Sequence, residues 1–226
     1  MATKKKKGKW IVKLLKIVVA TYLLLILCQL IGDAYSRLSV THNIPVSEEW
    51  NLIVVNRWNE LPEDYSVELT ELSNGQKVDS RIYPYLQEMF DAARAEGVYP
   101  VVREGYRTAE EQQEILEDRI QTYINQGYSR ARAEKTAKEW VALPGTSEHQ
   151  LGIAVDINAD KTKCSNDDVY AWLSENAYKY GFILRYPLDK QEITGTSYEP
   201  WHYRYVGVDV AKEIYEREIC LEEYFE

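Results

Sequence analysis

The sequence contains few residues of the types that form disulfides or bind transition metals, with three cysteines and three histidines in 226 residues. Cys28 falls within an apolar run near the N-terminus, so only Cys164 and Cys220 remain elsewhere. These two can form at most one disulfide, and their spacing matches no metal-binding motif. Beyond an N-terminal lysine tract, the chain also lacks internal repeats and low-complexity segments.

Charge is divided unevenly along the chain. Residues 1–16 contain seven lysines and no acidic residue, whereas the remainder carries 20 basic and 36 acidic side chains. An acidic domain of this kind is a poor match for nucleic acid, because binding there depends on neutralising phosphates. Nucleic acid is therefore excluded as a partner.

The lysine tract precedes a long apolar segment. Residues 17–31 contain no charge, and the apolar run begins near residue 10, which is long enough for a helix to span ~30 Å of hydrocarbon. We expect a transmembrane anchor at residues 17–32, with the basic segment 1–16 in the cytoplasm and the acidic domain outside the cell. The alternative is a cleaved signal peptide, with Gly32 and Ala34 as a weak cleavage signal; the length of the run favours retention.

Residues 33–50 are polar and irregular and predict a short stalk, followed by one domain over residues 51–226. Strand and helix patterns alternate in this domain, which predicts an α+β fold in which helices pack to one side of an antiparallel sheet. The predicted strands are 51–56, 98–107, 152–157, 182–187 and 201–207. The predicted helices are 78–97, 108–127, 129–142, 168–181 and a last one from about Val208.

Two of the three histidines lie in segments with functional patterns, whereas His42 lies alone in the stalk. His149, Asp156 and His202 can supply three ligands to a catalytic zinc, which leaves a fourth position for water. Glu199 is then a candidate general base beside that water. On a regular strand Glu199 and His202 would face opposite ways, so this hypothesis requires a bend at Pro200.

The residues alone leave other interpretations open. A histidine is more often a buried or surface residue than a ligand, "WHYRY" can be an ordinary aromatic strand, and Asp156 can cap a turn.

Several motifs in order along the chain resemble the VanY-type D-alanyl-D-alanine carboxypeptidases, which are zinc peptidases that include L,D-carboxypeptidases. The motifs are "PGTSEHQLGIAVDI", "GFILRYP" and "TGTSYEPWHYRYVG", together with "NRWNELPEDY", "VDSR" and "GYRTAEEQ", over residues from about 50 to 207. The resemblance implies one zinc ion per chain, bound by His149, Asp156 and His202, with Glu199 as the catalytic base.

The resemblance also implies that Arg107, Gln112 and Ser147 contact the substrate. An arginine can bind a free C-terminal carboxylate through two parallel hydrogen bonds. Without the resemblance, Arg107 reads as a surface salt-bridge residue and Gln112 as part of a solvated helix face. One departure is Glu104, where family members commonly have serine before "GYR", and this leaves the fine substrate preference open.

The function implied is a membrane-anchored zinc carboxypeptidase that removes a C-terminal D-alanine from peptidoglycan stem peptides outside the cell. The bond cleaved can be D,D or L,D. The alternative is a non-catalytic module that holds zinc structurally and binds cell-wall peptide or a protein partner.

Overall fold

A computed structural model describes residues 16, 18–19, 21–29 and 44–225. The chain divides into two compact units, Met1–Thr41 and His42–Glu226. Among the described residues, no helix has both the length and the apolar character needed to cross a membrane. The predicted segment 1–16 (except residue 16), residues 17, 20 and 30–32 of the predicted anchor, and residues 33–43 of the predicted stalk with His42 lie outside the described residues.

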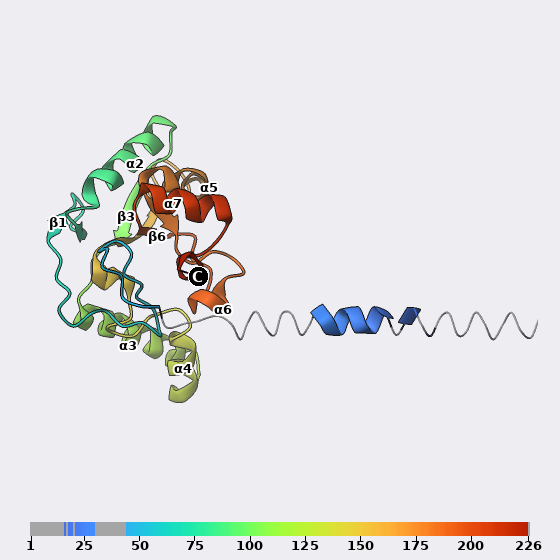
Figure 1. Cartoon of the computed structure of the whole chain (residues 1–226). Helices are drawn as coiled ribbons and strands as arrows, with labels where there is room; N and C mark the ends of the chain where they lie inside the picture. The colour runs from blue at the N-terminus through green and yellow to red at the C-terminus, as the bar shows by residue number, and fades with distance from the viewer. Residues whose placement is uncertain (1–15, 17, 20, 30–43, 226) are drawn as a thin grey trace, which may run out of the picture. The chain divides into compact units, whose positions relative to one another are not determined.

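The centre of the second unit is a four-stranded antiparallel sheet, as predicted, with strand order β3-β4-β6-β5 (Figure 1). Its strands are β3 (Pro100–Glu104), β4 (Ala154–Ala159), β5 (Phe182–Leu184) and β6 (His202–Tyr205). Side chains alternate between the two faces of a strand, so Val155 and Ile157 enter the main core while Asp156 between them faces the opposite side. This alternation separates a packing face from a face that carries polar side chains.

Helices α2 (Tyr83–Ala95) and α5 (Asn166–Asn176) cover the packing face. Their buried residues, among them Met89 and Trp172, form one cluster with Val155 and Ile157 of β4. Helix α7 (Val208–Arg217) instead packs with Ile183, which extends from the opposite face of β5. The predicted one-sided arrangement therefore applies to α2 and α5 but not to α7.

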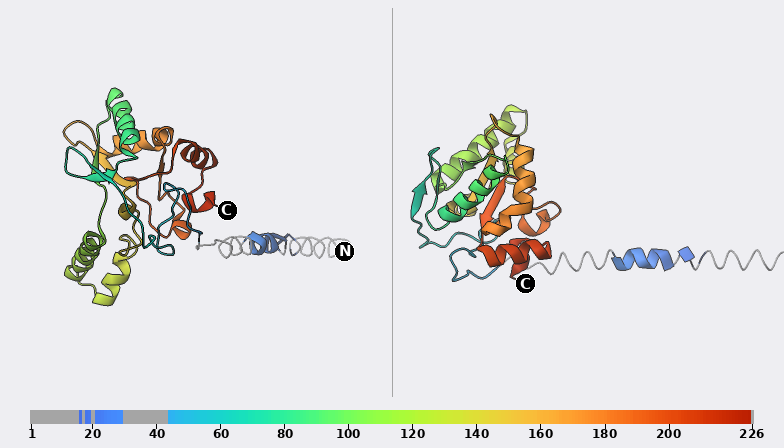
Figure 2. Two further views of the ribbon diagram at one scale, coloured as in Figure 1. Left: turned by 60° about the vertical axis from the view of Figure 1, so that its left-hand side comes forward. Right: turned by 90° about the horizontal axis from the view of Figure 1, so that it is seen from above.

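Helices α3 (Ala109–Asn125) and α4 (Arg130–Ala137) pack against each other around a small core of their own. Figure 1 and the left view of Figure 2 show them at the end of the domain away from α2, α5 and α7. Both helices begin at polar caps, because the Thr108 and Ser129 side chains each accept a hydrogen bond from a backbone N–H of the first turn.

Two local predictions are corrected. Residues 51–56 join no sheet, although 52–56 are buried, and within this segment only Asn56 forms an isolated bridge. The Arg204 guanidinium donates to the carbonyls of Asn51 and Ile53 in place of a partner strand. The helix predicted from residue 78 begins at Tyr83, because the preceding residues form a hairpin. That hairpin pairs β1 (Leu69–Glu71) with β2 (Lys77–Asp79).

Both cysteines of the domain, Cys164 and Cys220, are free thiols, so they form no disulfide with each other. Burial raises the pKa of Cys220 to about 12, which keeps this thiol protonated.

The remaining elements of the domain are short. They are the 3-10 turns η1 (Glu148–Leu151) and η2 (Ala177–Tyr180) and the helices α6 (Gln191–Thr194) and α8 (Leu221–Tyr224).

Candidate metal centre and active site

The three predicted zinc ligands meet on the polar face of the sheet. His149 lies in η1, which directly precedes β4, and Asp156 lies in β4. His202 is the first residue of β6 and is the cross-strand partner of Asp156. One ligand atom from each residue lies within 4.8 Å of the other two. Strand register thus brings together residues that are far apart in the sequence.

The hydrogen bonds of His149 fix which nitrogen is free to bind a metal. His149 Nδ1 lies 2.8 Å from the Gly105 carbonyl oxygen, which can only accept, so Nδ1 carries the hydrogen. The opposite nitrogen, Nε2, lies 3.4 Å from Asp156 Oδ1 with its lone pair available. Glycine is required at 105, because a Cβ there would lie 2.2 Å from the Lys77 carbonyl oxygen.

The second histidine is oriented by two carboxylates. His202 Nδ1 lies 3.0 Å from Asp156 Oδ1, and Nε2 on the other side of the ring lies 3.7 Å from Glu148 Oε2. A metal-binding histidine ordinarily gives its second N–H to such an outer carboxylate. His202 therefore presents Nδ1 to the metal position and Nε2–H to Glu148.

The residues present fit a zinc ion. Two imidazoles and one carboxylate are a donor set of catalytic zinc sites. Asp156 Oδ1 is buried and accepts no hydrogen bond, as expected for an atom that faces a cation. Although burial by itself would raise its pKa, His149 and His202 hold the pKa of Asp156 well below its usual range.

The two histidines differ in their proton affinity. Burial, and after it the positive charge of Arg107, lowers the pKa of His149 to about 4, so its imidazole is neutral. Burial also acts to lower the pKa of His202, but the adjacent carboxylates of Asp156 and Glu148 outweigh it and raise this pKa to about 9. A metal ion must therefore displace a proton from His202 but not from His149.

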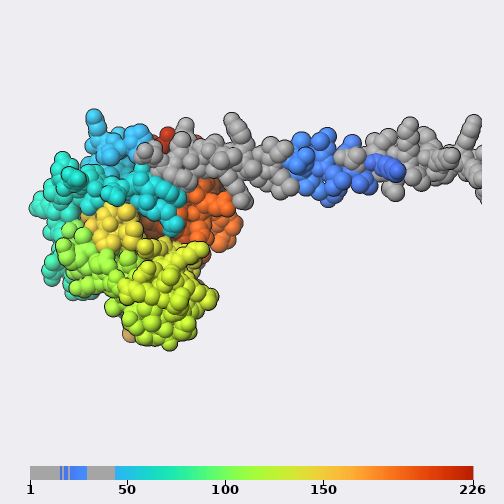
Figure 3. All heavy atoms as spheres, turned by 90° about the horizontal axis from the view of Figure 1, so that it is seen from below, coloured from blue at the N-terminus to red at the C-terminus, as the bar shows by residue number. Residues whose placement is uncertain are grey.

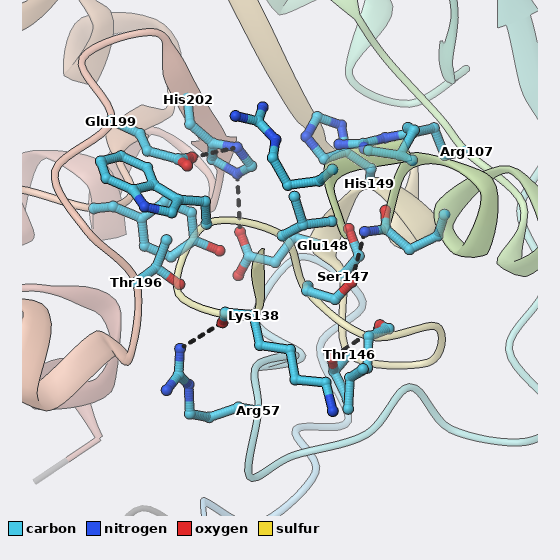
Figure 4. A pocket seen from close by; sticks show the side chains of 18 of the residues that line it. Arg57, Arg107, Lys138, Thr146, Ser147, Glu148, His149, Thr196, Glu199 and His202 are labelled. Carbon is cyan, nitrogen blue, oxygen red and sulfur yellow. Dashed lines mark hydrogen bonds and ion pairs between the residues drawn. The ribbon is translucent and has the colours of Figure 1, made fainter. Parts of the chain in front are cut away.

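Glu199 lies in a turn before β6, and the bend that the sequence required at Pro200 is present. The His202 N–H donates to the Glu199 carbonyl at 3.1 Å, and Glu199 Oε2 lies 3.8 Å from His202 Nδ1 (Figure 4). Burial raises the pKa of Glu199 to about 7. A carboxylate with this pKa can both accept and return a proton near neutral pH.

All seven predicted site residues line one cavity of about 770 Å³. Figure 3 shows a recess on this face of the domain, with yellow-green atoms of the α3–α4 region on one side and orange atoms of the chain after β5 on another. The lining of this cavity includes the three metal ligands and Glu199, and also Arg107, Gln112 and Ser147.

Arg107 and Gln112 each have a polar atom without a partner among the described residues. Arg107 Nε is buried without a hydrogen bond, and burial lowers the pKa of this guanidinium despite the nearby negative charge of Asp156. Gln112 is 1% exposed, which excludes the solvated-face interpretation; its Nε2 donates to the Ala142 carbonyl, and its Oε1 has no partner. Ser147 is buried where η1 begins, and Glu104 also lines the cavity.

The charged residues behind the ligands were not predicted from the sequence. Glu148, Arg185 and Arg204 are buried together, and Glu148 contacts His202. A signal was available in the sequence. Arg185 and Arg204 each stand within an otherwise apolar or aromatic segment, "FILRYP" and "WHYRYVG", whereas Glu148 stands in the polar stretch "TSEHQ" and gives no such signal.

Comparison with known proteins agrees with this geometry. The family model described as VanY, D-alanyl-D-alanine carboxypeptidase, matches residues 75–208. The chain belongs to the VanY family. A D-alanyl-D-alanine carboxypeptidase of Enterococcus faecalis is 60% identical over 177 residues, which make up 78% of this chain and 66% of that protein.

Two solved structures extend the VanY comparison. A mutant of the vancomycin resistance D,D-pentapeptidase VanY from a VanB-type cassette, in complex with Zn(II), is 60% identical; the match has a TM-score of 0.77 and covers 79% of this chain and all of that one. The LD-carboxypeptidase LdcB is 37% identical, with a TM-score of 0.65 and coverage of 78% and 86%.

Proposed function

We propose that this VanY-family domain is a zinc-dependent carboxypeptidase that removes a C-terminal D-alanine from peptidoglycan stem peptides. The observation that supports this proposal most directly is the set of residues that line one cavity. It combines a His149–Asp156–His202 metal set, a buried glutamate with a pKa of about 7, and a half-buried arginine with an unpartnered N–H.

Arg107 binds the free carboxylate at the C-terminus of the substrate. Its guanidinium lines the cavity and has a buried Nε–H to donate. A charge-assisted pair with a carboxylate is strong and directional, particularly where water is excluded. This contact restricts cleavage to the last peptide bond, because only a terminal residue offers a carboxylate at that position.

Glu199 moves the proton. It accepts a proton from the attacking water and returns it to the amine of the departing D-alanine. Zinc, when bound by the three ligands, supplies Lewis-acid polarisation of the scissile carbonyl and lowers the pKa of water from 15.7 to about 7. Gln112 holds the Ala142 carbonyl and so fixes the wall of the cavity, while its free Oε1 and the neighbouring Ser147 are available to the substrate.

Of the two stem-peptide bonds, we favour the D,D bond. The relative of known structure that is 60% identical to this chain is a D,D-pentapeptidase, whereas the LD-carboxypeptidase LdcB is only 37% identical. Glu104, which replaces the serine common before "GYR", lines the cavity and adds a carboxylate whose effect on this preference can be measured directly.

We also place the domain outside the cell, attached through an N-terminal membrane anchor over residues 17–32. Seven lysines precede an uncharged apolar run, and the orientation of such a segment keeps the lysines in the cytoplasm. Peptidoglycan is accessible only on the other side of that membrane.

The test is incubation of the zinc-loaded protein with a pentapeptide ending in D-Ala-D-Ala and with the tetrapeptide ending in one D-alanine. Release of D-alanine from the pentapeptide supports the D,D assignment, and release from the tetrapeptide alone shows an L,D enzyme. If neither peptide is cleaved while zinc is bound, the domain is a non-catalytic binding module.

A further inference from the structure

Four charged side chains lie buried directly behind the metal ligands. Glu148, Arg185, Arg204 and Glu222 are between 0% and 4% exposed. Replacing a buried ion network by apolar residues of similar volume is often neutral or stabilising, so stability alone does not account for such a network. Its position next to His202 indicates what it does.

Glu148 divides its two oxygens between different partners. Oε1 accepts hydrogen bonds from Arg185 Nε at 2.7 Å and from Arg204 Nη1 at 2.9 Å. Oε2 accepts none of these and lies 3.7 Å from His202 Nε2, and both of these atoms are buried without a hydrogen-bond partner. In Figure 4 the dashed line joins the Glu148 carboxylate to the His202 ring.

Only a carboxylate satisfies this arrangement, because donors approach both oxygens. A glutamine at 148 would turn its NH₂ group toward either the arginines or His202. The NH₂ donor would then face another N–H donor and could not form a hydrogen bond with it. With a carboxylate, the hydrogen of His202 stays on Nε2, and the Nδ1 lone pair points to the position shared with Asp156.

Arg185 connects this carboxylate to the C-terminal helix. Its Nη1 and Nη2 donate to the two oxygens of Glu222 at 2.8 and 2.6 Å, which is a bidentate pair. Asn56 Nδ2 donates to Glu222 Oε1 at 3.0 Å. Because Glu222 lies in α8, the end of the domain is linked to His202 through two buried ion pairs.

We propose that Glu148 is a positioning residue for the zinc ligand His202, and that Arg185 and Glu222 extend this support to helix α8. The inference rests on the zinc site of the proposed function. Glu148 acts through His202 and is not one of the three residues of the metal group. The function of the network is to hold one imidazole in the tautomer and orientation that binds zinc.

The test measures zinc affinity, by competition with a chelating dye, and the stability of the metal-free protein on the same samples. The variants are Glu148→Gln and Glu222→Gln. The matched control is Glu223→Gln, also in α8, where the side chain pairs with Lys190 and caps Cys220 but is not in the network. Glu148→Gln should weaken zinc binding by about 10–100-fold, the usual effect of removing an outer partner of a ligand. Glu222→Gln should weaken it less, and Glu223→Gln should leave it unchanged.

A purely structural network gives a different result. Glu148→Gln and Glu222→Gln would then destabilise the metal-free protein but bind zinc as tightly as Glu223→Gln, and this would overturn the proposal. If Glu148→Gln does not fold, Glu222→Gln decides the question alone, because it loosens Arg185 and leaves Glu148 in place. Wild-type protein that binds no zinc would instead refute the proposed function.

Discussion

Replacing Arg107 by alanine tests how the cavity recognises the end of a peptide. The guanidinium has a buried Nε–H without a partner, so a bound carboxylate would gain a charge-assisted hydrogen bond that the free protein does not make. Hydrogen bonds to charged groups contribute about 1.5–3 kcal/mol. Since about 1.4 kcal/mol corresponds to a factor of ten, kcat/KM for a free-acid peptide should fall roughly 10- to 150-fold in Arg107→Ala.

The assay compares D-alanine release from a free-acid pentapeptide with cleavage of the same peptide carrying a C-terminal amide. Wild type should strongly prefer the free acid, and Arg107→Ala should lose most of that preference. Zinc content should not change, because Arg107 is not among the ligands. If wild type cleaves the amidated peptide as well as the acid, Arg107 does not bind the carboxylate and the reasoning is wrong.

Three further predictions concern the acceptor of His149, the protons of the metal site and the side of the membrane on which the domain lies. Gly105→Ala should weaken zinc binding and lower thermal stability, because the new Cβ would lie 2.2 Å from the Lys77 carbonyl oxygen and displace the acceptor of His149; unchanged zinc affinity would contradict this. At pH 8, zinc binding should release about one proton. His202, with a pKa of about 9, is still protonated at this pH and must lose its proton to bind zinc, whereas Glu199, with a pKa of about 7, is already ionised. The apparent zinc affinity should therefore rise with pH up to about 9. Calorimetry in buffers of different ionisation enthalpy measures the release, and its absence would refute the assignment. Protease added to wall-free cells should digest the domain and spare the N-terminal lysines, and a protected domain would place it inside the cell.

The sequence predicted the sheet and the metal ligands for a physical reason. The zinc ligands must converge on one ion, and in this chain they come from two short motifs, with His149 in the turn before β4, Asp156 within β4 and His202 at the start of β6. Asp156 and His202 are direct cross-strand partners, so placing the two strands side by side in this register also places the two ligands. The bend at Pro200, which the chemistry required, followed from the inability of proline to donate to a strand ladder.

Other features could not be read from local patterns. Residues 51–56 look like a strand because Leu52, Ile53, Val54 and Val55 are apolar, but they are buried beside Arg204 rather than in a sheet. Periodicity reports which side chains are buried, and it does not report which group satisfies the backbone. The β1–β2 hairpin was missed because its strands have three residues each, too few for an alternating pattern to be recognised.

The ion network is a second case of this kind. Glu148 contacts residues 37 and 56 positions away in the sequence, and a buried charge next to a histidine has no fixed spacing from its partners. The presence of arginine within a strand-like segment was the available signal, and only the tertiary structure shows that Arg185 and Arg204 share one carboxylate.

The most direct test of the account is Glu199→Gln, with zinc content and D-alanine release measured on the same purified sample. Glutamine is nearly isosteric but cannot accept a proton from water, and Glu199 is not one of the three metal ligands. Zinc should therefore remain bound, and turnover should fall by about 10²–10⁴-fold, the usual contribution of a general base. Loss of zinc would show that Glu199 is a ligand, and full activity would show that it is not the base.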